Sequence, residues 1–110
     1  MRLEPEMNSL HLQQLAYTYM MARDYEAAAP LFRERIKILP KTDTSRGYLV
    51  SVLGHLGRID EAQIVWAELK TINPHYSLRK RLERRWFKDP ADFERLLDGM
   101  RRAGIPEDEI

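Results

Sequence analysis

A set of small, aromatic and proline residues recurs along this chain of 110 residues at a constant spacing of 34 positions. The first set is Ala28, Phe32 and Pro40, and the second set is Ala62, Trp66 and Pro74. A fixed period of this length is typical of repeat proteins, in which each unit buries its apolar face only against neighbouring units. The period therefore predicts a stack of similar units rather than one irregular fold.

Each copy contains two successive stretches with the apolar spacing of one helix face, i, i+3, i+4 and i+7. In the first copy these stretches contain Leu12, Leu15, Ala16 and Tyr19, and then Ala28, Leu31, Phe32, Ile36 and Leu39. Pro40 and Pro74 end the second helix of each pair, because proline lacks an amide hydrogen and its ring clashes with the preceding turn. Each copy is therefore expected to be a pair of helices.

The matched residues resemble the tetratricopeptide repeat family, whose helix–turn–helix unit carries this pattern. The first copy departs from the family pattern at Leu12 and Ala16. The second copy departs at Arg46 and Val50, although residues 57–62 are similar to the family's turn between helices. The resemblance implies an all-α fold, in which a right-handed stack of antiparallel helix pairs is closed by a terminal helical hairpin.

The chain is expected to be one domain, because its length is ordinary for a single domain. Repeat one spans residues 8–41, repeat two spans residues 42–75, and residues 76–110 form the capping helices. Residues 1–7 are interpreted either as the remnant of a preceding repeat or as a loose terminus. Asn8 and Ser9 are the expected caps of the first helix, because their side-chain oxygens accept hydrogen bonds from free amides.

The terminal segment carries strong signals for a last helix. Asp89 is the expected N-cap, Pro90 the first helical residue and Gly104 the stop. Three stretches resemble the tail that follows tetratricopeptide repeats in many bacterial class III adenylate and guanylate cyclases: residues 73–78, 87–93 and 97–107. That resemblance implies the carboxy-terminal part of a larger bacterial signalling protein.

Composition excludes several classes of protein. Hydrophobic residues make up 44% of the chain and charged residues 32%, as in soluble globular proteins. No apolar run reaches the roughly 18 residues of a membrane span. Cysteine is absent, which favours a cytoplasmic location. We therefore expect a cytoplasmic protein with no membrane partner.

No catalytic or metal-binding pattern is present in the sequence. The three histidines, His11, His55 and His75, have no second ligand type at helical ligand spacing. A glycine-rich phosphate loop, a nucleophile elbow and a paired-carboxylate signature are all lacking. The sequence therefore predicts that the protein is not an enzyme and needs no metal or other cofactor.

Charge is distributed unevenly near the end of the chain. Residues 75–88 contain six basic residues and one acid, whereas residues 89–110 contain seven acids and three arginines. A nucleic-acid-binding interpretation uses the basic segment Arg79–Lys88, with Trp86 and Phe87 as stacking platforms. We favour the alternative that the two segments neutralise each other across a helical hairpin.

The best functional candidate is a groove lined by the first helix of each pair, as the resemblance implies. Its expected lining residues are Leu10, Gln13, Tyr17, Met20, Tyr48, Ser51 and His55. Flexible Met20 and amphipathic Tyr17 suit contact with a peptide. The predicted function is non-catalytic binding of a protein or peptide, with no small-molecule substrate. Alternatively, some of these residues pack against a preceding repeat.

The amino-terminal side of the chain also predicts self-association. An apolar patch on the outer side of the first helix pair is expected to pair with its copy in a two-fold dimer, since one patch is then used twice. The residues expected in this patch are Leu10, Tyr17, Met20 and Met21.

Overall fold

The computed structural model describes residues 5–84 and 89–110, and every regular element in these two ranges is helical. The helices are α1 (Pro5–Met21), α2 (Tyr25–Ile38), α3 (Asp43–His55), α4 (Ile59–Ile72), α5 (Leu78–Glu83), α6 (Pro90–Arg102) and the 3₁₀ helix η1 (Glu107–Glu109). The all-α class predicted from the sequence is thus confirmed. Within the described ranges, no helix combines the length and apolar character needed to cross a membrane.

The period of 34 residues is reproduced by the helix boundaries. Helices α2 and α4 both have 14 residues, and α4 begins and ends 34 positions after α2. Helices α1 and α3 also end 34 positions apart, at Met21 and His55. Ala28 and Ala62 are fully buried, as their small size at the helix contact predicts. Each copy is therefore a pair of helices.

The turn inside each pair has the same backbone geometry. Arg23 and Gly57 lie 34 positions apart and have φ angles of 66° and 76°. Each follows the first helix of its pair and donates its amide to a carbonyl three residues earlier, Met20 in one case and Gly54 in the other. A left-handed residue after the last helical turn is a common way to satisfy the free carbonyls there.

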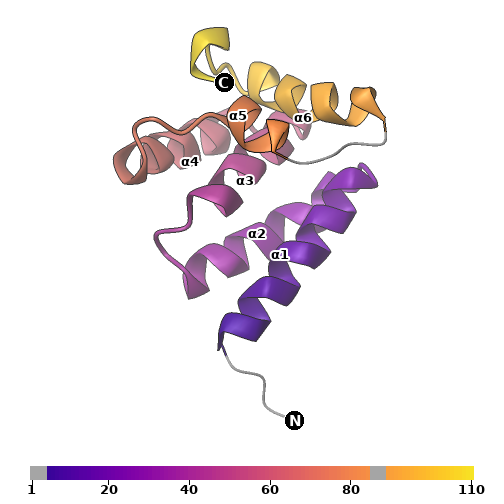
Figure 1. The fold of residues 1–110 in the computed structure, drawn as a ribbon, viewed down its shortest axis with the longest axis vertical. Coiled ribbons are helices and arrows are strands. Elements are labelled where there is room, and N and C mark those ends of the chain that lie inside the picture. The colour runs from indigo at the N-terminus through magenta and orange to yellow at the C-terminus, as the bar shows by residue number, and fades with distance from the viewer. Residues whose placement is uncertain (1–4, 85–88) are drawn as a thin grey trace.

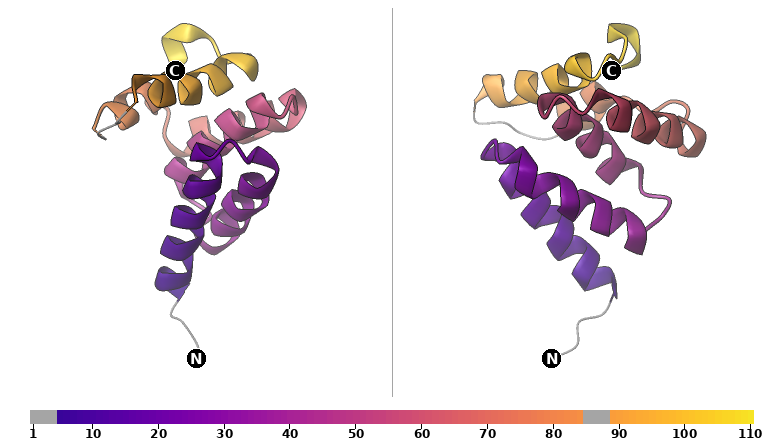
Figure 2. Two further views of the ribbon diagram at one scale, coloured as in Figure 1. Left: turned by 90° about the vertical axis from the view of Figure 1, so that its right-hand side faces the viewer. Right: turned by 180° about the vertical axis from the view of Figure 1, so that it is seen from behind.

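Consecutive helices pack against each other, from α1 through α2 and α3 to α4, and α6 packs on α3. Figures 1 and 2 show the pair α1 and α2 at one end of the molecule and α6 at the other, with α3 and α4 between them. Helix α3 is therefore central, and residues 45–54 are all buried. The aromatic part of the core is formed by Phe32, Tyr48 and Tyr17. The ring of Tyr48 contacts the rings of both Phe32 and Tyr17.

Most expected helix ends are confirmed, but the first helix begins earlier than expected. Thr42 and Asp89 cap α3 and α6 through their side-chain oxygens. Asn8 and Ser9, expected as caps, lie inside α1, and Pro5 is its first residue. Proline suits that position because its missing amide hydrogen would have no partner there. The rest of the possible remnant, residues 1–4, lies outside the described residues.

The terminal segment covers the core mainly through α6. Leu96, Leu97 and Met100 are buried, and Phe93 is partly buried against the core. Helix α5 has only six residues, Leu78–Glu83, and Trp86 lies outside the described residues. Because α6 packs chiefly on α3, its contact with α5 is small.

Candidate binding site

The predicted groove residues fall into two groups in the structure. Leu10 is exposed, Gln13, Tyr17 and His55 are partly buried, and Met20, Tyr48 and Ser51 are buried. Gln13 and Tyr17 of α1 line an open recess, whereas Ser51 and His55 of α3 contact α6. We call the side of α1 and α3 that carries these seven residues the inner face.

The recess on α1 has a volume of about 370 Å³ and is lined by Gln13, Gln14, Tyr17 and Thr18. Ser45 of α3 donates a hydrogen bond of 2.8 Å to the side-chain oxygen of Gln13. The same hydroxyl accepts a hydrogen bond of 2.8 Å from Arg35 of α2. Gln13 is therefore held by its oxygen, and its amide nitrogen has no acceptor among the described residues.

Tyr17 is fixed by an aromatic contact. Its ring meets the ring of buried Tyr48 edge to face, with 5.6 Å between the centroids. Leu10 lies two turns earlier on α1 and is 57% exposed. Aromatic rings with a polar end and exposed aliphatic side chains are suited to contact with peptides. Met20, which the sequence placed in the groove, is fully buried and cannot contribute such a surface.

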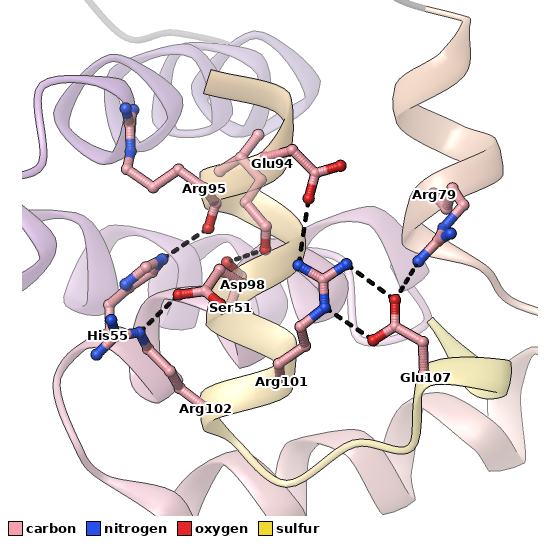
Figure 3. Close-up of polar contacts among 10 residues, drawn as sticks. Ser51, His55, Arg79, Glu94, Arg95, Asp98, Arg101, Arg102 and Glu107 are labelled. Atoms are coloured by element: carbon pink, nitrogen blue, oxygen red, sulfur yellow. Dashed lines mark hydrogen bonds and ion pairs between the residues drawn. The ribbon is translucent and has the colours of Figure 1, made fainter. Parts of the chain in front are cut away.

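Helix α6 fills the α3 half of the inner face. The Ser51 hydroxyl donates a hydrogen bond of 2.7 Å to the carbonyl of Leu96, and Nε2 of His55 lies 2.8 Å from the carbonyl of Arg95 (Figure 3). Gly54 and Gly99 bring the two backbones into direct contact, because a Cβ atom on either would collide with the opposite helix. Ser51 is therefore a core residue, and Tyr48 is buried against Tyr17 and Phe32, so the continuous open groove expected from the sequence is not observed.

His55 supports α6 as a neutral side chain. Its ring stacks on Tyr25 with 4.6 Å between centroids and an angle of 6° between the planes. Burial lowers the pKa of His55, although the Arg95 carbonyl acts in the opposite direction. Because a carbonyl can only accept, Nε2 carries a proton and donates the hydrogen bond to the backbone carbonyl of Arg95.

The end of α6 is held by an ion-pair network. Glu107 accepts hydrogen bonds from Arg101 at 2.8 Å and from Arg79 at 2.6 Å, and Arg101 also contacts Glu94 at 3.2 Å (Figure 3). The bonds from Arg101 and Arg79 lower the pKa of Glu107 to about 2. The carboxylate therefore stays charged in all but strongly acidic solution.

The basic segment is less neutralised than the sequence suggested. Among the described residues, Arg79 contacts an acid of the terminal segment, Glu107, but Arg81 instead pairs with Asp43 of α3 at 3.2 Å. Lys80 and Arg84 are exposed and have no partner in the described parts of the chain. The predicted neutralisation is incomplete because α6 packs on α3 and several of its acids pair with arginines of its own helix. Arg85 and Lys88 lie outside the described residues.

No group of three histidine, aspartate or glutamate residues that could hold a metal ion occurs within residues 5–84 and 89–110.

The structure also contains a recess that the sequence did not predict. It lies between α2, α3 and α4, has a volume of about 510 Å³, and includes Arg46 among its lining residues. Arg46 departs from the repeat pattern, and that departure is the one feature of the sequence that could have pointed to this recess.

Compared with models of protein families, with curated proteins and with solved structures, the chain gives no match.

Proposed function

We propose that this protein is a non-catalytic protein-interaction module of the tetratricopeptide kind, which binds a peptide or partner domain on the inner face of α1. The observation that carries the proposal is the open recess that Gln13 and Tyr17 line, with exposed Leu10 on the same helix. Helix α6 occupies the α3 half of the same face, so that half is closed to a partner. Binding is therefore expected near the amino-terminal end of the inner face.

The chemistry of this recess suits an extended peptide segment. Glutamine side chains can both donate to and accept from a peptide backbone, and Gln14 is exposed beside Gln13. The ring of Tyr17 is held in one orientation by Tyr48, so less side-chain freedom is lost on binding. Leu10 adds an apolar contact. We therefore expect a partner segment with one or two apolar side chains and a free backbone edge.

The cellular context is also a proposal. The resemblance of the terminal segment to cyclase tails supports a role as the carboxy-terminal regulatory part of a larger bacterial signalling protein. In that role the module would bring the signalling domain to its partner. The partner itself is expected to be a protein rather than a small substrate.

The experiment is affinity capture from a lysate of the source organism, with the immobilised chain as bait and mass spectrometry as the readout. Leu10→Glu and Gln14→Arg change exposed side chains of α1, one turn before the recess and in its lining, so they should abolish specific capture without unfolding the protein. Ile59→Glu is the matched control, because Ile59 is 37% exposed on α4. Equal capture by the wild type and both recess variants would contradict the proposal.

The same variants test self-association through the amino-terminal face. Buried Met20 cannot take part, which reduces the expected patch to Leu10 and the partly buried Tyr17 and Met21. Sedimentation across a concentration series should show dimers that Leu10→Glu dissociates. A monomer at every concentration would eliminate the dimer and leave the peptide proposal unaffected.

Nucleic-acid binding through Arg79–Lys88 is the second candidate. Lys80 and Arg84 favour it, because they are exposed and have no acidic partner among the described residues. Anisotropy of a labelled single-stranded oligonucleotide should then show affinity that falls steeply with salt and is weakened by Lys80→Gln with Arg84→Gln. Lys37→Gln is the matched control on α2. Absence of binding at low salt would eliminate this candidate.

A further inference from the structure

The recess between α2, α3 and α4 lies outside the inner face. Binding at this recess would be an activity separate from the function proposed above. Apolar side chains from all three helices form much of its lining: Ile36, Leu49, Ile64 and Val65. Leu49 is fully buried, whereas Ile64 is 62% exposed at the rim. Its volume of about 510 Å³ falls within the roughly 300–1,000 Å³ of small-ligand sites.

Arg46 is the unusual residue in this recess. It lies on α3, is only 7% exposed, and occupies the position that Leu12 holds in the first copy, 34 residues earlier. Burying a guanidinium group is costly unless its hydrogen bonds are satisfied. The second copy therefore carries a charge at a position where the first copy has an apolar side chain.

The hydrogen bonds of Arg46 account for only part of its donors. Nη1 donates to the carbonyl of Thr42 over 2.9 Å, and Nε donates to Glu68 over a long 3.4 Å. A guanidinium group has five N–H donors, so three remain, one on Nη1 and two on Nη2. Nη2 has no acceptor among the described residues. It is not one of the fully buried polar atoms without a partner, so it remains exposed to solvent. Arg46 is one of the residues that line the recess.

The charges around the recess favour a single negative charge. Its lining includes three cations and two carboxylates. Glu61 is engaged by Arg33 at 2.9 Å, and the side chain of Glu68 is 51% exposed, so it can move aside from Arg46. A dianion such as phosphate would meet both carboxylates. A purely apolar ligand would leave the donors of Arg46 without acceptors and cut off from water.

We propose that this recess binds a small monocarboxylate that carries an apolar chain. The carboxylate accepts two parallel hydrogen bonds from the Nη1 and Nη2 edge of Arg46, a geometry that guanidinium groups favour. The apolar chain lies against Leu49 and Ile64. The ligand is thus recognised by one charge at the base and by apolar contact along the walls.

The first test uses 4-methylpentanoate and its neutral isostere, 4-methylpentanamide, as probes. Titrations followed by the methyl NMR signals of Ile36, Leu49 and Ile64 detect weak binding directly. We expect saturable shifts with the acid at a Kd of about 1 mM, and at least about tenfold weaker binding of the amide. Equal binding of acid and amide, or no saturable shift with the acid, would overturn the proposal.

Variants locate the binding energy. Arg46→Met keeps the length of the side chain but removes the charge, so it should weaken acid binding by about tenfold and leave amide binding unchanged. Ile64→Glu places a carboxylate at the rim and should weaken acid binding without affecting folding, since Ile64 is 62% exposed. Ile72→Glu, on the same helix but outside the recess, is the matched control. Acid binding that survives both recess variants would place the ligand elsewhere and overturn the proposal.

A further arm identifies the source of the carboxylate. The dipeptide acetyl-leucyl-leucine, with a free carboxylate, presents the same chemistry as the end of a peptide. If it binds more than about tenfold tighter than 4-methylpentanoate, the site is for peptide ends and the small-ligand proposal is wrong. Leu10→Glu should leave all of these titrations unchanged, so failure of the inner-face proposal would be seen separately.

Discussion

Replacing Gly54 by alanine would place a methyl group where α3 and α6 are in backbone contact. The added Cβ would overlap the carbonyl oxygen of Gly99 and lie 2.9 Å from its carbonyl carbon and 3.0 Å from the amide nitrogen of Ala103. These are backbone atoms of α6 and of its C-cap residue, so no side chain can rotate away to make room. Helix α6 must therefore move away from α3 as a unit.

The expected loss of stability combines opposing effects. Alanine is favoured over glycine within a helix by up to about 1 kcal/mol. Overpacking in a close contact costs about 1–3 kcal/mol. Displacement of α6 also weakens the hydrogen bonds from Ser51 and His55, at about 1 kcal/mol each. The net destabilisation is about 2–4 kcal/mol, which lowers the melting temperature of a domain of this size by roughly 10 °C or more.

Thermal melting and urea unfolding, both followed by circular dichroism, measure this loss. Ala67→Gly is the matched control, because Ala67 is exposed on α4 and the change isolates helix propensity at a cost of about 1 kcal/mol. A Gly54→Ala variant that is as stable as the wild type, or more stable, would refute the packing of α6 on α3.

Three further predictions concern the turn, the core and pH. Arg23→Gly should stabilise the protein by about 1 kcal/mol, because Arg23 has φ of 66° where Gly57 serves in the second copy; a lower urea midpoint would contradict this. Phe32→Ala removes a fully buried aromatic ring and should cost about 3–5 kcal/mol, so an unchanged melting temperature would refute its place in the core. Burial lowers the pKa of His55, so the unfolded chain binds a proton that the native state resists. Stability should therefore fall as the pH decreases through about 6.5, and urea midpoints of His55→Gln should lack this part of the slope; identical slopes would contradict the assignment.

Much of the fold could be predicted because its signals are local. The spacing of Ala28 and Phe32 from their matches, and the prolines after each pair, are read along the chain without knowledge of distant contacts. Caps are equally local, so Asp89 was identified correctly as the cap of the last helix. The start of the first helix was wrong because two polar residues that can cap a helix can also lie within one.

The candidate site was harder to predict. The resemblance placed Gln13 and Tyr17 on the inner face, and both adjoin an open recess there. It also placed Met20 and Ser51 on an open surface, but both are buried. The sequence pattern describes one repeat and its neighbours, whereas burial at these positions depends on the whole chain.

The sequence by itself determined the helix pairs, their period and their ends, because these follow from side-chain periodicity and from residues that start or stop a helix. Only the tertiary structure decided that α6 covers the inner face of α3, and that Arg46 opens into a recess between three helices. Both depend on the shapes of surfaces that meet at long sequence separation. Two glycines, Gly54 and Gly99, allow α6 to approach α3 closely, and no periodic pattern in either helix alone shows that they will meet.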